Sequence, residues 1–124
     1  MPGKLVHFEV PASESSRAKK FYSDLFGWEF QSWEGPIEYN MTQAGGDPGG
    51  AIYPSENGGS GFLVYFDVDD INAGAASVRK AGGEAEDPGP IPGVGWYAQC
   101  KDTEGNKFGI FQSDESAGGG NPQG

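Results

Sequence analysis

The sequence predicts an α+β fold in which one βαβββ unit is written twice along the chain. The alternating segment Leu5–Val10 returns 58 positions later as Leu63–Val68, with apolar residues at matching positions. Each segment is followed by a stretch of helical periodicity and then by short strand-like pieces between Gly and Pro turns. Gly (22) and Pro (9) make up a quarter of the 124 residues, a composition that disfavours a long-helix bundle.

The first helix is expected over residues 13–26. Ser13 is positioned to cap its start, Glu14 adds an acidic first turn, and Gly27 is suited to end it. Spacings of three, four and seven residues define one apolar stripe, which is expected to face the core: Ala18, Phe21, Tyr22 and Leu25.

The second helix is expected to begin after Asp69 or Asp70, either of which can cap it, and to stop at Gly82–Gly83. It contains four alanines, so the side chains that it packs against the sheet are smaller than those of the first helix.

Short strands are expected after each helix, at 28–32, 38–43 and 50–53 in the first unit and at 84–86, 95–101 and 107–112 in the second. Residues 1–114 are therefore expected to form one domain, with unit one at 4–56 and unit two at 61–114. Residues 115–124 carry no apolar side chain larger than Ala117 and are expected to form a disordered tail.

The charge balance excludes some partners. Eight basic residues against 18 acidic ones give a net charge of -10, which disfavours binding to nucleic acid or to an anionic membrane surface. The lone Cys100 rules out an intramolecular disulfide and is expected to be a small buried hydrophobe. With no signal peptide and no apolar run of roughly 18 residues, a soluble cytoplasmic protein is expected.

Three segments give the chain a family resemblance. They are VHFEV at 6–10, AKKFYSDLFGW at 18–28 and DTEGNKFGIFQ at 102–112. Together with the duplication, they resemble the vicinal oxygen chelate superfamily, which includes glyoxalase I, extradiol dioxygenases, fosfomycin-resistance enzymes and bleomycin-binding proteins. The resemblance covers nearly the whole chain before the tail.

The resemblance implies a cup-shaped, curved mixed sheet made by the two units, with the helices outside. Active members of the superfamily bind one divalent metal in the cup, with ligands from the first and last strand of each unit. The matching positions here hold His7, Tyr65, Gly50 or Ala51, and Gly109. Only His7 is an ordinary metal ligand, and a catalytic metal needs about three protein ligands, so no metal and no cofactor are expected.

His7 and Glu9 are the candidate catalytic residues, because an imidazole and a carboxylate together can act as acid and base. They are two positions apart on one strand. Their backbones are therefore separated by roughly 7 Å, which is long for a direct hydrogen bond.

An aromatic pocket is the better supported site. Its expected ligand-binding residues on the concave face are His7, Tyr65, Tyr39, Met41, Tyr97 and Gln99, with Trp33 and Trp96 at the rim. Asn40 and Thr42 would then face the helix. Flat aromatic walls with a few polar groups suit a planar organic ligand. The alternative is that these side chains fill a closed cup.

Three functions remain open from the sequence. The favoured one is metal-free binding of an aromatic or amphipathic metabolite or antibiotic. The second is a glyoxalase-like lyase or isomerase that uses a non-standard metal site or His7 and Glu9. The third is an interaction module with a closed cup. The expected partners are a small-molecule ligand and, in a homodimer, a second copy of the chain.

Overall fold

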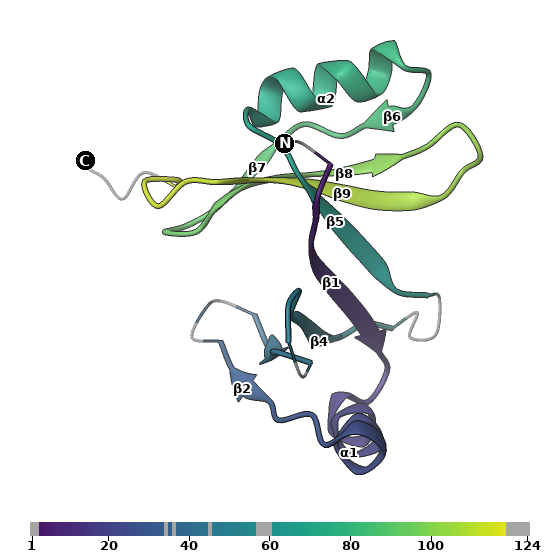
Figure 1. The fold of residues 1–124 in the computed structure, drawn as a ribbon, viewed down its shortest axis with the longest axis vertical. Coiled ribbons are helices and arrows are strands. Elements are labelled where there is room, and N and C mark those ends of the chain that lie inside the picture. Colours follow the sequence, from purple (N-terminus) through teal and green to yellow (C-terminus); the bar gives the residue numbers. More distant parts are fainter. Residues whose placement is uncertain (1–2, 34, 36, 45, 57–60, 119–124) are drawn as a thin grey trace. The chain divides into compact units, whose positions relative to one another are not determined.

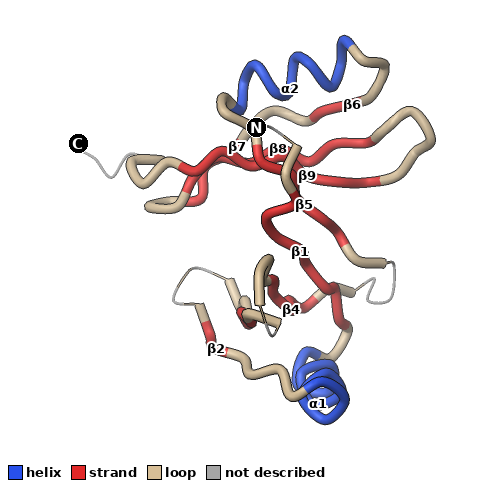
Figure 2. Tube along the Cα trace, viewed as in Figure 1, coloured by secondary structure: helices blue, strands red, loops and turns tan. Residues whose placement is uncertain are grey.

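The computed structural model describes residues 3–33, 35, 37–44, 46–56 and 61–118. They belong to two compact units: Val6–Val64, here the N-terminal unit, and Met1–Leu5 with Tyr65–Gly124, here the C-terminal unit. Each unit contains a helix and strands in both parallel and antiparallel pairing (Figures 1 and 2). The predicted α+β class and the duplicated unit are confirmed.

The N-terminal unit places its strands in the order β2-β3-β4-β1. β4 runs parallel to β1, whereas β3 is antiparallel to both β2 and β4. The bounds are β1 Leu5–Ala12, α1 Ser15–Phe26, β2 Gln31–Ser32, β3 Asn40–Thr42 and β4 Gly50–Pro54.

α1 starts two residues later than the sequence predicts. Glu14 is the residue at the N-cap, and its side chain makes no capping hydrogen bond, so the expected cap at Ser13 is wrong. Gly27 ends the helix as predicted. It adopts φ 74°, a left-handed conformation that glycine reaches without steric cost, and its N–H donates to the Ser23 carbonyl.

The apolar stripe predicted on α1 is only half buried. Ala18 and Tyr22 pack against a core of Val10, Ala12 and Ile52, whereas Phe21 and Leu25 are each 56% exposed. After Gly27 the chain folds back, and Trp28 stacks on Tyr22 with ring centroids 5.1 Å apart. Trp28, which follows the helix, therefore covers Tyr22. The helical periodicity had predicted that residues of α1 alone would form this apolar contact surface.

The C-terminal unit has the strand order β5-β9-β8-β6, with β7 paired to β8. β5 is parallel to β9, and the other pairs are antiparallel. The bounds are β5 Leu63–Asp67, α2 Ile71–Lys80, β6 Glu84–Ala85, β7 Gly89–Ile91, β8 Gly95–Lys101 and β9 Lys107–Ser113. β7 was missed from the sequence because it is three residues long and centred on a proline.

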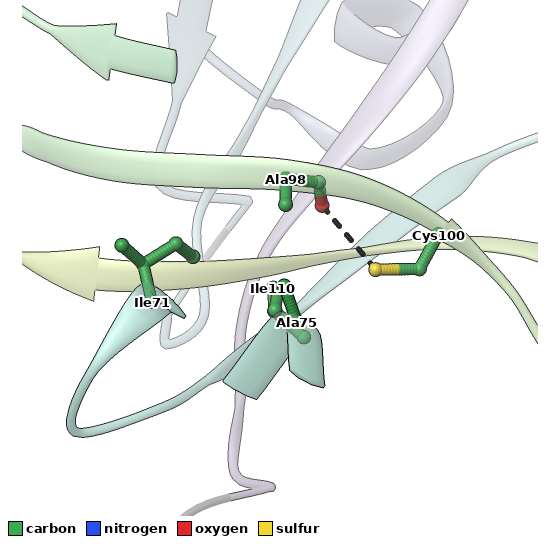
Figure 3. Packing of buried hydrophobic residues seen from close by; sticks show 5 residues of the cluster. All are labelled: Ile71, Ala75, Ala98, Cys100 and Ile110. Carbon is green, nitrogen blue, oxygen red and sulfur yellow. Dashed lines mark hydrogen bonds between the residues drawn. The ribbon is translucent and has the colours of Figure 1, made fainter. Parts of the chain in front are cut away.

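α2 begins as predicted, with the Asp70 side chain accepting a hydrogen bond from the Ala73 N–H. Its inner face contributes Ile71 and Ala75 to a core completed by Ala98, Cys100 and Ile110 of the sheet (Figure 3). Cys100 is 4% exposed, so the expectation of a small buried hydrophobe is confirmed.

The expected disordered tail is wrong for residues 115–118. Ala117 is 1% exposed, and its carbonyl accepts a hydrogen bond from the Gly93 N–H. Asp114 also donates its backbone N–H to the Val94 carbonyl. The segment therefore packs against the turn between β7 and β8. Residues 119–124 lie outside the described residues.

Among the described residues, no helix is long and apolar enough to span a membrane.

Candidate functional site

One face of the N-terminal sheet gathers the polar residues that the sequence singled out. Strand alternation places His7 and Glu9 on the face of β1 opposite to Phe8. Glu9 lies directly across from Ala51 of β4, and Ala51 lies across from Met41 of β3. Residues paired across a sheet point to the same side, so His7, Glu9 and Met41 share one face.

Tyr39 joins His7 to Glu9. Its phenolic oxygen lies 2.6 Å from His7 Nε2 and donates a hydrogen bond of 2.6 Å to Glu9 Oε2. A phenol carries one proton, and here that proton points to the carboxylate. The phenol therefore accepts from His7, which requires the tautomer of the neutral ring that carries its proton on Nε2.

The surroundings of His7 favour its neutral form. Burial lowers the pKa of His7 below its ordinary value of 6.5, because the charged ring loses hydration, and the Glu9 carboxylate offsets part of this effect. The pKa of Tyr53 on β4 is raised, first by burial and then by the negative charge of Glu9. Glu9 is thus the centre of negative charge on this face.

Trp33 extends the face beyond the strands. Its ring meets Tyr39 edge-on, with centroids 5.9 Å apart, and its backbone N–H donates to the Tyr39 carbonyl over 2.8 Å. Met41 is 39% exposed, so the face is open to solvent beside the rings. We call the set of His7, Glu9, Trp33, Tyr39 and Met41 the His7 face.

Asn40 and Thr42 are buried on the opposite side, as the sequence predicts. Asn40 Oδ1 accepts a hydrogen bond from Lys19 of α1, and Asn40 Nδ2 donates to the Ile52 carbonyl. These contacts fix which way β3 faces, and so they hold Tyr39 and Met41 on the His7 face.

The C-terminal unit carries a second polar and aromatic row. Tyr65 and Gln99 both lie opposite Gly109, one on each neighbouring strand. Gln99 Nε2 donates to the Tyr65 phenol over 3.1 Å. Tyr97 lies two residues before Gln99 on β8 and shares this side of the sheet.

Trp96 does not share that side. It packs against the core under α2, and its indole N–H donates to Asp114 over 3.0 Å. Alternation along β8 turns Trp96 away from its neighbour Tyr97, so its predicted place at the rim of the pocket is corrected. Of the other predicted ligand-binding residues, the structure groups His7, Tyr39, Met41 and Trp33 in one unit and Tyr65, Tyr97 and Gln99 in the other.

A family model described as Glyoxalase/Bleomycin resistance protein/Dioxygenase superfamily matches residues 4–110. The chain belongs to this superfamily. A glyoxylase-like domain-containing protein of Didymella fabae is 37% identical over 119 residues, covering 87% of this chain and 92% of that protein. The Mycobacterium tuberculosis protein CFP32, whose name carries the word glyoxylase, is 32% identical over 89% of this chain. The chain spans 44% of the length of CFP32.

Solved structures agree on the superfamily fold. A methylmalonyl-CoA epimerase from Mycobacterium tuberculosis has a TM-score of 0.68 at 14% identity, with 90% of this chain and 88% of that chain covered. A hypothetical protein from Bacillus halodurans has a TM-score of 0.70 at 15% identity, with 94% and 99% covered. At these identities the similarity concerns the fold alone.

The residues at the superfamily's metal positions do not fit a divalent metal. His7 Nε2 already bonds to Tyr39, and Ala51 on the same face has no donor atom. A Cβ at Gly109 would lie 2.3 Å from the Tyr65 ring, so that ring fills the space of a longer side chain. The described residues contain no group of three or more His, Cys, Asp or Glu side chains placed to hold a metal.

The structure also decides between the two candidates for the last strand of unit one. Gly50 lies opposite Phe8, and a Cβ there would meet the Phe8 ring at 2.5 Å. Gly50 therefore faces the α1 side, and Ala51 occupies the position on the His7 face.

The bridging role of Tyr39 was missed from the sequence. The sequence predicts that Tyr39 lines the pocket and that the spacing along the strand is long for a direct hydrogen bond between His7 and Glu9. The signal that could have revealed the bridge is the pairing register of β3, which cannot be read from strands three to five residues long.

Proposed function

We propose that the protein binds a small organic molecule on the His7 face without a metal. The observation that carries the proposal is the chain of hydrogen bonds from His7 through Tyr39 to Glu9. These hydrogen bonds engage His7 Nε2 and Glu9 Oε2, the atoms that would otherwise bind a metal. They also hold the two polar side chains in place beside the rings of Trp33 and Tyr39. Sites for small organic molecules typically combine aromatic walls with a few placed polar groups.

The chemistry of the face suggests the class of ligand. Trp33 and Tyr39 offer ring surfaces, and the Met41 thioether adapts to irregular shapes. Glu9 supplies negative charge, and the whole chain has a net charge of -10. A planar molecule that carries hydrogen-bond donors or a positive charge suits this combination better than an anion does.

A second function has one specific observation in its favour. Tyr39 connects an imidazole to a carboxylate, so once His7 takes a proton from a bound molecule on Nδ1, its Nε2 proton can pass to the phenol while the phenol gives its own proton to Glu9. This arrangement supports the alternative of a lyase or isomerase using acid–base chemistry, as the names of the relatives suggest. The fold itself does not choose between the two functions.

The single histidine of the chain allows a direct test. The Hε1 proton of its imidazole gives an NMR signal that belongs to His7 without ambiguity, and this signal can be followed while planar aromatic cations, neutral compounds and anions of similar size are added. We expect a cationic or neutral member of the panel to shift this signal saturably and to raise the melting temperature. A ligand present at a hundred times its Kd stabilises the folded state by about 2.7 kcal/mol.

Variants locate the binding. Trp33→Ala removes a ring from the face and should weaken binding roughly tenfold, which corresponds to about 1.4 kcal/mol. Phe21→Ser, a change at an exposed aromatic residue of α1, serves as the matched control and should leave binding unchanged. The binding proposal is abandoned if no compound in the panel moves the His7 signal.

Adding metal ions separately tests the claim that the His7 face works without a metal. Zn²⁺, Ni²⁺ or Mn²⁺ added at one equivalent should leave the His7 signal in place. Stoichiometric binding that is lost in His7→Ala would overturn the metal-free reading while leaving ligand binding open.

A further inference from the structure

Tyr53, near the end of β4, lies on the same side of the sheet as the His7 face. Its neighbour Ile52 is buried in the core against α1, and side chains alternate along a strand, so Ala51 and Tyr53 point to the other side. Ala51 lies opposite Glu9 of β1, and Tyr53 follows two residues after Ala51. Tyr53 and Glu9 are therefore diagonal neighbours with backbones roughly 8 Å apart, a distance that a phenol and a carboxylate together can span.

The Tyr53 phenol keeps a proton that it can donate. Among the residues that the structure describes, none forms a hydrogen bond with this phenol. Burial and the negative charge of Glu9 raise the pKa of Tyr53 above its ordinary value, so the phenol stays protonated at neutral pH. His7, Tyr39 and Glu9, by contrast, are bonded to one another. Tyr53 is thus positioned to donate its proton to a bound molecule.

Glu9 and Tyr53 offer opposite kinds of hydrogen bonding. An ionised carboxylate only accepts, and its two oxygens provide about four lone-pair sites, so a donor from a ligand can add to the bond from Tyr39. A protonated phenol donates its single proton. The face therefore presents an acceptor beside a donor, and the complementary edge of a ligand carries a donor beside an acceptor.

We propose that the molecule bound on the His7 face is a planar lactam or amide, whose N–H donates to Glu9 and whose carbonyl accepts from Tyr53. The inference rests on the proposed binding function and names the chemical class of its ligand. A lactam carries the N–H and the carbonyl on adjacent atoms, and a ring fused to it can lie against Trp33 and Tyr39.

A simple cation fits the pair less well than a lactam does. It would satisfy Glu9 but leave the Tyr53 proton without an acceptor, and a buried donor without a partner weakens binding. All the residues involved belong to the N-terminal unit, so the site needs nothing from the other unit.

Three planar bicyclic compounds separate the two hydrogen bonds. Carbostyril, a fused lactam, has both groups, N-methylcarbostyril lacks the N–H, and indole has an N–H but no carbonyl. Calorimetry should show that the wild type binds carbostyril roughly tenfold more tightly than N-methylcarbostyril, because the lost bond is to a charged group, and roughly fivefold more tightly than indole. The Hε1 signal of His7 should shift with each compound, which places the binding on this face.

A variant of Tyr53 tests its role directly. Tyr53→Phe removes the phenolic oxygen and keeps the ring, so it should weaken carbostyril and N-methylcarbostyril roughly fivefold and leave indole unchanged. Tyr22→Phe makes the same chemical change on the α1 side of the sheet and should leave all three affinities unchanged. A merely structural effect of Tyr53→Phe would weaken the three compounds alike, and circular dichroism checks that both variants fold.

The outcomes distinguish this inference from the proposed function. Equal affinities for the three compounds, or a Tyr53→Phe variant that binds carbostyril as tightly as the wild type, would overturn the lactam class and leave ligand binding standing. If none of the three moves the His7 signal, the lactam class is wrong. The binding function itself fails when the wider panel of aromatic cations, neutral compounds and anions leaves that signal in place as well.

Discussion

The phenolic oxygen of Tyr39 connects the single histidine of the chain to Glu9, with both contacts at 2.6 Å. A direct bond between residues two apart on a strand is too long, and a third residue from another strand closes the distance. At the residue scale, the protonation of His7 is therefore the most informative quantity to measure.

We expect the pKa of His7 to lie below 6.5, because burial disfavours the charged ring more than Glu9 favours it. In the pH range between the folded pKa and 6.5, the unfolded chain binds this proton more readily than the folded chain. The stabilisation from a neutral His7 is thus complete above pH 6.5 and is lost as the pH falls through the folded pKa.

An NMR titration of the imidazole measures the pKa directly, and nitrogen shifts should show the proton on Nε2. In urea unfolding between pH 5 and 8, His7→Gln should lose less stability than the wild type as the pH is lowered. A midpoint at or above 6.5, or equal pH dependence in both proteins, would contradict the expectation.

At the scale of the elements, glycines let neighbouring strands bring large rings close to the backbone. Gly109 of β9 lies beside Tyr65 of β5, and Gly50 of β4 lies beside Phe8 of β1. In each pair a single Cβ would enter the space of the ring. The absence of a side chain at Gly109 and Gly50 is therefore a packing requirement of this chain, and only Gly109 also stands at a position where the superfamily resemblance implies a metal ligand.

Gly109→Ala should destabilise the protein by about 1–3 kcal/mol, because the new methyl group would lie 2.3 Å from the Tyr65 ring. Gly46→Ala is the matched control. A Cβ at Gly46 has nothing within 4 Å, so the change should stay within about 0.5 kcal/mol. Equal urea midpoints for the two variants would show that the Tyr65 ring moves aside freely.

The sequence predicted most helices and strands, but not all of their boundaries and contacts. Alternation and helical spacing gave both helices and every strand except β7, because these patterns extend over five or more residues or lie between clear turn signals. The start of α1 and the packing of residues 115–118 were missed. Both depend on contacts that local composition does not encode, such as the burial of Ala117 beside Gly93.

At the scale of the whole molecule, the net charge of -10 is the property that bears most on stability. The 18 acidic side chains exceed the eight basic ones, and the resulting repulsion is stronger in the compact state than in the unfolded chain. Salt bridges do little to offset it. In the pair Lys20–Asp24, for example, the two side chains are 76% and 66% exposed, so solvent and salt screen their attraction.

Added salt should therefore stabilise the protein. Raising NaCl from about 0.1 M to about 1 M shortens the Debye length from about 10 to about 3 Å, and the melting temperature should rise by several degrees. KCl at the same concentration controls for a specific effect of sodium and should act alike. A melting temperature that falls with salt would show that attractive ion pairs outweigh the net repulsion.

The sequence by itself determined the duplication, the α+β class and the superfamily, because these are properties of periodicity and of motifs along the chain. Alternation is local, so it also placed His7 on the same face as Glu9 and Tyr39 on the same face as Met41, whereas the pairing of β1, β4 and β3 decided that the two pairs share one face. Closure of the two units into a cup stays a prediction.

Only the tertiary structure decided that Tyr39 bridges His7 to Glu9 and that Trp96 turns to the core. It likewise showed that α1 leaves Phe21 and Leu25 exposed. The physical reason is that strand register and helix packing are fixed by contacts between residues far apart in sequence. No pattern within a single element carries that information.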